Sequence, residues 1–332
     1  MKVLVVVASL IALSAAGAVP LVPGDNSDYV EGVSRYIWMP DGDDVPHLVD
    51  LEEPVDFSAF NSRNGANNQY WLFTRYNRNN HQILVNGDIN SVRNSNYRAN
   101  RPTKVIVHGW NSNGNSGVNT YARDAFLAVQ DCNVIVVDWR SLANSGYNTA
   151  VNGVPNVGQF LGNFLVWLFN NAGGNWNDLH LVGFSLGAHV VGNAGRQAGG
   201  RPRRVTGLDP AGPRWGGNAQ ALNTQAGRYV EAIHTDGGTL GIMDRIAHVD
   251  YYPNGGRNPQ PGCWISTCSH SRAYRFFAAS VRYNRFAGRQ CSNMNQVSNN
   301  QCAGSTLHMG NGIISKSGNG IFRVNTGANW PF

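Results

Sequence analysis

The sequence has 332 residues, a formal net charge of +6 at pH 7 and a hydrophobic fraction of 42%. This length is enough for one large α/β domain with a sizeable core. The arginines are scattered, with no basic run beyond residues 201–204, and no nucleic-acid-binding motif is present, so the positive charge does not indicate a nucleic-acid-binding protein.

The N-terminus has the features of a secretory signal peptide. Lys2 precedes a long apolar run, and the small residues Ala16 and Ala18 precede Pro20. This pattern predicts a signal peptide over residues 1–18 and a secreted protein. No later stretch approaches the roughly 18 apolar residues that a spanning helix needs, so we expect no transmembrane segment.

An acidic leader is predicted over residues 19–63. Residues 19–56 contain ten acidic residues and one arginine, whereas residues 57–332 contain 24 basic and ten acidic residues. The opposite charges suggest a pro-segment that covers basic surface and is removed by trypsin-like cleavage after Arg35 or Arg63. A solvated acidic tail is the alternative.

The positive charge comes almost entirely from arginine, with 23 arginines and three lysines. Arginine keeps its proton beyond pH ~12, whereas lysine loses its proton near pH ~10.4. We therefore hypothesise that the protein works in alkaline fluid, such as an alkaline gut lumen. Codon bias is the alternative explanation, although the abundant asparagine weakens it.

From residue 100 onward, short apolar runs alternate with segments of helical pattern. Strands are predicted over residues 104–110, 133–139, 179–185, 204–210, 229–235 and 248–253. Helices are predicted over residues 118–129, 157–172, 186–199 and 270–283. This alternation favours an α/β fold with a mostly parallel central sheet and helices on both faces. We expect a single catalytic domain over residues 64–332, without a C-terminal β-sandwich domain.

Secretion favours disulfide bonds among the five cysteines. Cys263 and Cys268 frame a very short loop, and Cys291 and Cys302 frame a second loop near the C-terminus. Cys132 lies beside a predicted buried strand, so we expect an unpaired core thiol there, with an intermolecular disulfide as the alternative.

Ser185 lies between Gly183 and Gly187 in GFSLG, which fits the G-x-S-x-G pattern of α/β-hydrolases. In that fold the serine sits on a strained strand-to-helix turn, where side chains two residues before and two after would clash. A predicted strand precedes Ser185 and a predicted helix follows it. The context therefore predicts that Ser185 is a nucleophile.

A serine nucleophile requires a histidine base and a carboxylate that orients the base. On this fold the partners follow in the order serine, acid, histidine. Asp209 is the first acidic residue after Ser185, at the end of a predicted strand. Four histidines come later, and spacing alone does not choose among His234, His248, His270 and His308.

Seven motifs occur in the order and spacing of the pancreatic lipase family, which the chain resembles over about residues 65–332. They are HGW (108–110), VDW (137–139), GFSLGAH (183–189), GLDPAGP (207–213), HTDGG (234–238), DYYPNGG (250–256) and CSHSRAY (268–274). The resemblance implies a triad of Ser185, Asp209 and His270. It also implies a structural role for His234 and places His108 behind the oxyanion turn.

A developing oxyanion needs backbone N–H donors aimed at it. The N–H of Leu186, which follows the nucleophile, is one candidate on mechanism as well as on resemblance. The resemblance implies the N–H of Trp110 as the second donor.

The loop between Cys263 and Cys268 departs from the larger lipases of that family, which carry a long lid there. The lid loop here has only four residues, namely Trp264, Ile265, Ser266 and Thr267. The loop at residues 237–248 also looks short. Both features resemble the phospholipase A1 and galactolipase branch, so we expect an open cleft and little interfacial activation.

We expect no metal and no cofactor, because residues 221–227 offer asparagine and glutamine where the family's calcium segment carries carboxylates. We also expect no colipase-type partner. The predicted function is a secreted serine ester hydrolase that releases fatty acids from glycerolipids at a membrane, micelle or emulsion surface. The alternatives are a neutral triacylglycerol lipase and a catalytically silent lipid-binding or storage protein.

Overall fold

The computed structural model describes residues 19–332, so the predicted signal peptide at residues 1–18 lies outside the described residues. The strands are β1 (Tyr36–Pro40), β2 (Pro46–Asp50), β3 (Gln69–Phe73), β4 (Gln82–Leu84), β5 (Thr103–Val107), β6 (Asn133–Asp138), β7 (Leu179–Phe184), β8 (Arg204–Leu208), β9 (Val230–Ile233), β10 (Val249–Pro253), β11 (Ala287–Cys291), β12 (Thr306–His308) and β13 (Gly320–Val324). The α-helices are α2 (Ile89–Arg93), α3 (Gly117–Val129), α4 (Arg140–Ala143), α5 (Tyr147–Ala172), α6 (Leu186–Gln197), α7 (Ser266–Tyr283) and α8 (Met294–Asn299).

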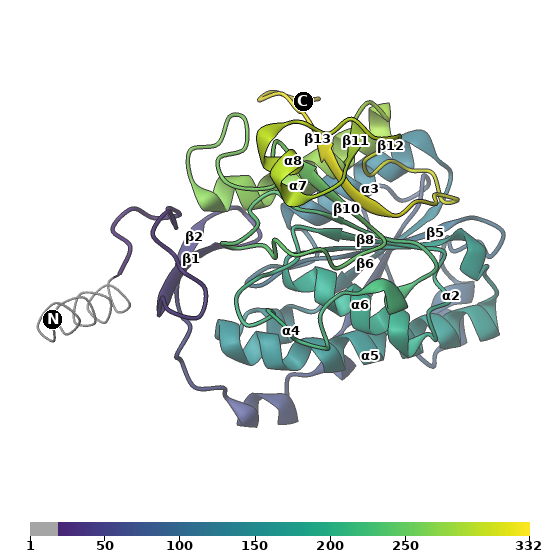
Figure 1. Ribbon diagram of the computed structural model, residues 1–332. Helices are drawn as coiled ribbons and strands as arrows, with labels where there is room; N and C mark the ends of the chain where they lie inside the picture. Colours follow the sequence, from purple (N-terminus) through teal and green to yellow (C-terminus); the bar gives the residue numbers. More distant parts are fainter. Residues whose placement is uncertain (1–18) are drawn as a thin grey trace, which may run out of the picture.

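One 11-stranded sheet forms the centre of the molecule, and helices cover both of its faces (Figure 1). The strand order is β12-β11-β13-β10-β9-β8-β7-β5-β6-β3-β4. The pairs from β6 across to β13 are parallel, whereas the strands at the two edges pair antiparallel. The predicted α/β fold with a mostly parallel sheet is confirmed.

Each central strand contributes side chains to two hydrophobic cores, because successive residues of a strand point to opposite faces. In β5, Val105 and Val107 belong to the core shared with α5 and α6. Ile106, between them, belongs to the core shared with α3 and α7. Burial on both faces explains why this strand is continuously apolar rather than alternating.

Two helices begin earlier than predicted: α5 at Tyr147 rather than residue 157, and α7 at Ser266 rather than residue 270. In α5, Pro155 and the nearby glycines are residues that commonly interrupt a helical pattern. Tertiary packing overrides this signal. A Cβ on Gly158 would lie 2.5 Å from the Cβ of Asn193 on α6, so the glycine permits the two helices to approach closely.

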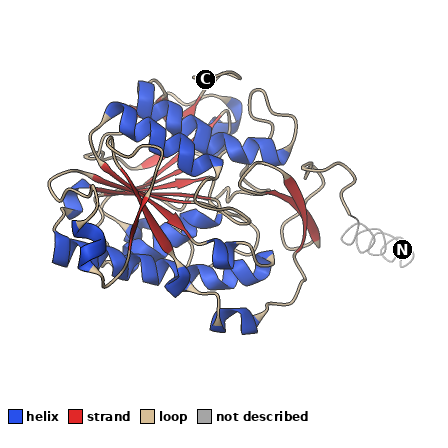
Figure 2. Cartoon of the chain, turned by 180° about the vertical axis from the view of Figure 1, so that it is seen from behind, coloured by secondary structure: helices blue, strands red, loops and turns tan. Residues whose placement is uncertain are grey.

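The segment predicted as an acidic leader is folded against the domain. Strands β1 and β2 form an antiparallel hairpin that stands apart from the large sheet (Figure 2). Ile37, Met39 and Val49 belong to the same hydrophobic core as α5 and α6. The amide of Asn148 on α5 donates to the carbonyl of Glu53 at 2.7 Å. The hairpin is therefore a packed part of the domain.

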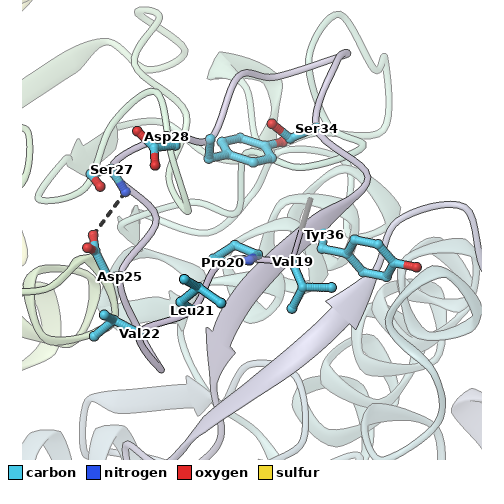
Figure 3. A pocket seen from close by; sticks show the side chains of 10 residues that line it. Val19, Pro20, Leu21, Val22, Asp25, Ser27, Asp28, Ser34 and Tyr36 are labelled. Carbon is cyan, nitrogen blue, oxygen red and sulfur yellow. Dashed lines mark hydrogen bonds between the residues drawn. The ribbon is translucent and has the colours of Figure 1, made fainter. Parts of the chain in front are cut away.

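Within the described chain, Asp44 is the one leader carboxylate that pairs with an arginine outside the leader, at 2.6 Å from Arg275. Asp50 and Glu52 pair instead with Arg35 in the leader itself. A hollow of about 460 Å³ is lined by residues 19–36 of the same segment (Figure 3). Apolar packing and main-chain hydrogen bonds, rather than many ion pairs, hold the leader in place.

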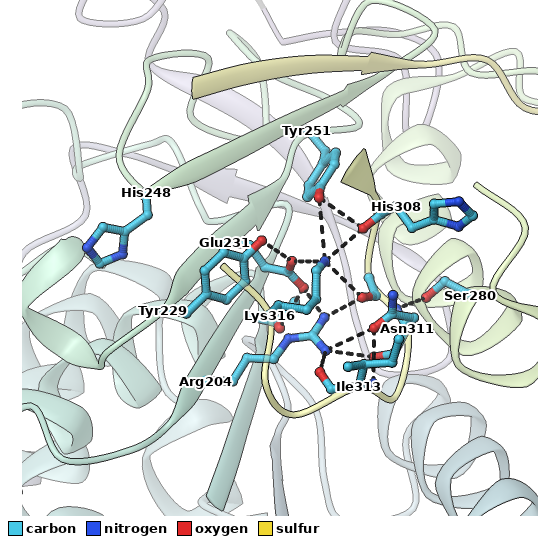
Figure 4. A network of polar contacts seen from close by, with 12 residues as sticks. Arg204, Tyr229, Glu231, His248, Tyr251, Ser280, His308, Asn311, Ile313 and Lys316 are labelled. Carbon is cyan, nitrogen blue, oxygen red and sulfur yellow. Dashed lines mark hydrogen bonds and ion pairs between the residues drawn. The ribbon is translucent and has the colours of Figure 1, made fainter. Parts of the chain in front are cut away.

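A buried ionic network fixes the C-terminal segment to the sheet (Figure 4). The carboxylate of Glu231 on β9 accepts from Arg204 on β8 at 2.5 Å and from Lys316 at 2.7 Å. Lys316 also donates to the carbonyl of His308 at 2.8 Å. These charges are partnered, which offsets the cost of burying them. None of the helices within residues 19–332 is long and apolar enough to cross a membrane.

Candidate active site

Ser185 lies at the carboxyl end of β7, on the turn that leads into α6. Its backbone angles, φ 55° and ψ −122°, are ones that residues other than glycine rarely adopt. Its N–H donates to the carbonyl of Leu208 at 3.0 Å, and its carbonyl accepts from the N–H of Ala188 at 3.1 Å. The surrounding structure thus maintains a strained residue, as the nucleophile turn of an α/β-hydrolase requires.

The two glycines that flank Ser185 are required by close backbone contacts. A Cβ on Gly183 would lie 2.1 Å from the carbonyl oxygen of Gly187. A Cβ on Gly187 would lie 2.3 Å from the carbonyl oxygen of Val107, at the end of β5. Any larger residue at either position would push the turn away from the sheet.

Asp209 and His270 form a buried pair at the same edge of the sheet. The Nδ1 atom of His270, on α7, lies 2.6 Å from Oδ2 of Asp209, which directly follows β8. The other carboxylate oxygen of Asp209 accepts from the N–H groups of Thr235 at 2.7 Å and Asp236 at 3.1 Å. These donors leave Oδ2 to orient the imidazole, as the acid of a triad does.

The other three histidines after Asp209 have different partners. His234 is buried between the carbonyl of Ile242 and the carboxylate of Asp250, at 2.7 and 2.9 Å. His248 accepts from the N–H of Val230 at 3.0 Å, and His308 contacts the carbonyl of Asn284 at 2.8 Å. The tertiary structure therefore makes the choice that spacing alone left open.

Two main-chain donors are available beside Ser185. Leu186 is the first residue of α6, so its N–H has no acceptor within the helix. The N–H of Trp110 makes no hydrogen bond to another residue within the described part of the chain. The turn that carries Trp110 is fixed through His108, whose Nε2 accepts from the N–H of Trp139 at 3.2 Å.

Ser185 and His270 line one cavity, in which the space that water-sized molecules can occupy is about 10 Å³. Its other lining residues are Met39, Pro40, Trp110, Tyr147, Ala211 and Leu240. Pockets for small ligands commonly measure about 300–1,000 Å³, so this cavity is small. Met39 and Pro40 of the N-terminal hairpin form part of its wall.

Two disulfide bonds join Cys263 to Cys268 and Cys291 to Cys302, and Cys132 is a free, buried thiol. The first disulfide lies at the start of α7, close in sequence to His270.

The lid loop is shorter than predicted. Ser266 and Thr267 are buried in the first turn of α7, where the Ser266 hydroxyl donates to the carboxylate of Asp236. The N–H of Thr267 donates to the carbonyl of Gly24 at 3.3 Å. Only Trp264, which is 92% exposed, and Ile265 remain as a loop.

The segment that corresponds to the family's calcium site does not suit a metal ion. In this segment, residues 221–227, the oxygen atoms already accept hydrogen bonds: the carbonyl of Ala221 accepts from Arg196 at 2.9 Å, and the side-chain oxygen of Asn223 accepts from the N–H of Gln225 at 3.0 Å. Within residues 19–332, no cluster of three or more histidine, cysteine or acidic side chains is suited to hold a metal. We derive no step that uses a metal.

Sequence reasoning missed four lining residues from three parts of the chain, namely Met39, Pro40, Tyr147 and Leu240. Met39 and Pro40 lie in a segment that was judged separate from the domain because of its charge. Tyr147 was missed because the start of α5 was placed too late. The shortness of the loop at residues 237–248 was the one available signal near Leu240.

The strand order, the strained turn at Ser185 and the adjacent Asp209–His270 pair define an α/β-hydrolase. The chain matches the family model described as Lipase over residues 41–319, and it belongs to the lipase family. This range begins inside the predicted leader, in the loop between β1 and β2.

Curated relatives agree with this assignment. The chain is 32% identical over 288 residues to the pancreatic triacylglycerol lipase of Myocastor coypus, covering 78% of this chain and 62% of the relative. It is 31% identical over 328 residues to pancreatic lipase-related protein 2 of Bos taurus, covering 87% of this chain and 69% of the relative. The chain thus spans less than two thirds of the first of these relatives.

Solved esterases overlap with the chain only in part. The carboxylesterase EstE1 from a metagenomic library has a TM-score of 0.29 and 13% identity, covering 60% of this chain and 50% of its own. The fold assignment therefore rests on the strand order and the turn at Ser185.

Proposed function

We propose that the protein is a serine carboxylic-ester hydrolase that releases fatty acids from glycerolipids. The observation that carries this proposal is that Ser185, on its strained turn, and His270, bound to Asp209, line the same cavity. Membership of the lipase family supports a lipid ester as the substrate.

In the proposed reaction, the hydroxyl of Ser185 attacks the acyl carbonyl while His270 accepts the hydroxyl proton. Asp209 fixes the imidazole and stabilises its protonated form. The N–H groups of Leu186 and Trp110 bind the oxyanion. His270 then protonates the departing alcohol, leaving an acyl ester on Ser185. Water, deprotonated by His270, attacks this ester, and His270 then returns the proton to the oxygen of Ser185 as the fatty acid leaves.

Within this class, we propose glycerolipids with polar head groups, as in phospholipase A1 and galactolipases, as the preferred substrates. The loop of Trp264 and Ile265 is too short to form a covering helix beside the site, which supports this proposal. Triacylglycerol is the competing substrate, because relatives named as pancreatic triacylglycerol lipases match the chain at similar identity.

The lipid surface is the proposed partner, and Trp264 is a candidate contact with it. Trp264 projects at 92% exposure from a loop that is anchored by the disulfide Cys263–Cys268. A large exposed aromatic side chain is suited to the interface between water and lipid. We propose secretion into alkaline fluid on the basis of the arginine-rich composition.

The decisive experiment compares fatty-acid release by the wild-type protein and by Ser185→Ala. Each is assayed on phosphatidylcholine vesicles, galactolipid micelles and a triacylglycerol emulsion, from neutral to strongly alkaline pH. We expect release by the wild type, none above background by the variant, and greater rates on the polar lipids at alkaline pH.

The outcomes separate the alternatives. Equal rates for wild type and variant would contradict the role of Ser185. A faster reaction on the emulsion would identify a triacylglycerol lipase. Binding of vesicles without any release would identify a silent lipid-binding protein, and a maximum at or below neutral pH would reject the alkaline setting.

A further inference from the structure

The loop between β1 and β2 contacts both the helix that carries His270 and the oxyanion turn at Trp110. We propose that Asp44 in this loop is a positioning residue, which holds the helix that carries His270 against the oxyanion turn. This inference rests on the proposed function, because it assigns a role in the same reaction.

The carboxylate of Asp44 binds three side chains of α7. Its Oδ1 accepts from the hydroxyl of Ser271 at 2.5 Å. Its Oδ2 accepts from the hydroxyl of Tyr274 at 2.8 Å and from the guanidinium of Arg275 at 2.6 Å. All three donors lie within five residues of His270, so one side chain fixes the helical turn that presents the base.

A chain of aromatic contacts leads from Asp44 to the base. The ring of Tyr274 packs edge-to-face on Phe184, with centroids 5.3 Å apart. Phe184 immediately precedes the nucleophile, and its ring lies 4.6 Å from the ring of His270. Tyr274 is only 3% exposed, so its hydroxyl requires a partner such as Asp44.

The same loop is bonded to the oxyanion turn through its backbone. The N–H of Gly42 donates to the carbonyl of Asn111, the residue after Trp110, at 3.1 Å. The carbonyl of Gly42 accepts from the N–H of Gly117, at the start of α3, also at 3.1 Å. The loop therefore joins the oxyanion turn to α7 across the mouth of the site.

Asp44 has a backbone that favours glycine. Its φ is 64°, in the left-handed region that costs L-residues free energy. Aspartate tolerates this region better than most residues, but a loop selected only for stability would favour glycine here. The three contacts of the carboxylate explain why an acidic side chain occupies the position.

The left-handed backbone provides a sharp test. Asp44→Gly removes the carboxylate and suits the backbone, whereas Asp43→Ala is the matched control. Asp43 carries the same charge on the adjacent residue and is exposed. Both variants are assayed with p-nitrophenyl butyrate, a soluble ester, well below their melting temperatures. Phosphorylation of Ser185 by diethyl p-nitrophenyl phosphate is measured in parallel.

We expect Asp44→Gly to lower kcat by about tenfold to a hundredfold with KM unchanged, because small displacements of catalytic groups have effects of this order. Phosphorylation of Ser185 is expected to slow by the same factor, since it requires the same base and oxyanion donors. Asp43→Ala is expected to match the wild type.

A second variant, Tyr274→Phe, removes only the hydroxyl that donates to Asp44 and keeps the ring on Phe184. We expect its kcat to fall severalfold, and this test holds even if Asp44→Gly folds poorly. Equal kcat for Asp44→Gly and Asp43→Ala, or a kcat above that of the wild type, would overturn the inference.

The inclusion of Ser185→Ala separates the two proposals. A wild-type rate that equals the rate of Ser185→Ala contradicts the proposed function and the role of Asp44 together. If the wild type and Asp44→Gly both react far faster than Ser185→Ala and at equal rates, the role of Asp44 is contradicted and the proposed function is not.

Discussion

His270 Nδ1 and Asp209 Oδ2 lie 2.6 Å apart, although the residues are 61 positions apart in the sequence. Asp209 follows β8 and His270 lies in α7, so the pair depends on how α7 packs on the sheet. Asp209 itself has a strained backbone, with φ 39°. The geometry commits the carboxylate to one imidazole nitrogen and leaves the other nitrogen for the proton that we propose it accepts from Ser185.

We predict that Asp209→Asn lowers kcat by roughly 10⁴-fold, the order seen when a triad acid is replaced by its amide. The amide removes the charge that stabilises the imidazolium and allows the wrong tautomer. The measurement is kcat on a soluble ester, with the melting temperature as a check on folding. Asp250→Asn is the matched control, since Asp250 orients His234 rather than His270. If both variants are fully folded and lose kcat equally, the assignment of Asp209 as the triad acid is contradicted.

Met39 is predicted to limit the length of the acyl chain. It is buried and lines the small cavity beside Ser185. Met39→Ala enlarges that cavity, so kcat/KM for an octanoate ester relative to a butyrate ester should rise by about tenfold, the order expected for added methylenes in an apolar pocket. Val49→Ala provides the control, because Val49 belongs to the same core but does not line the cavity. An unchanged ratio would place the acyl chain elsewhere.

Cleavage after each of the two arginines predicted as processing sites, Arg35 and Arg63, would remove a different part of the leader. A cut after Arg35 releases residues 19–35 and keeps the hairpin, whereas a cut after Arg63 also releases Met39 and Asp44. We therefore predict that any processing of the active protein occurs at or before Arg35. N-terminal sequencing of the secreted, active protein provides the test. An N-terminus at Asn64 would contradict the role of Asp44 and support the longer pro-segment, and an intact leader would reject a pro-segment altogether.

Lys104 should make the stability depend on alkaline pH. It is fully buried, and its ammonium makes no hydrogen bond within residues 19–332. Burial lowers the pKa of Lys104 to about 8, against about 10.4 in the unfolded chain. Between these values the unfolded chain binds more protons, so the free energy of unfolding rises with pH. Below pH 8 the penalty of the buried charge is fully present.

We predict that Lys104→Met raises the free energy of unfolding at pH 7 by an amount on the order of 3 kcal/mol. This gain should shrink as pH rises from about 8 and vanish near 10.4, where the lysine is neutral in both states. Urea unfolding at several pH values measures it. Lys316→Met is the contrast. Burial lowers the pKa of Lys316 to about 8 as well, but its ammonium is paired with Glu231 at 2.7 Å and donates to the carbonyl of His308, so its loss leaves buried acceptors without a partner and should destabilise the protein. A gain for Lys104→Met that is independent of pH would contradict the charge explanation.

Local patterns in the sequence determined the central sheet, the turn at Ser185 and the two short disulfide loops. Continuous apolar runs can form only buried strands or helices, and their short length favoured strands. The glycines around Ser185 indicated close backbone contacts, and the structure locates these at Gly187 and Val107. The motifs that resemble the pancreatic lipase family pointed to His270 among the four later histidines.

The resemblance aside, only the tertiary structure decided which histidine meets Asp209 and which distant segments line the site. Spacing does not specify the packing angle of α7, which brings His270 rather than His248 to the carboxylate. The charge of residues 19–63 suggested a separate leader, but none of the charged side chains of the hairpin is fully buried, while Ile37, Met39 and Val49 enter the core. Net charge is a property of the surface and does not indicate where a segment packs. A few buried apolar residues, together with the contacts that Asp44 makes to α7, hold the hairpin at the active site.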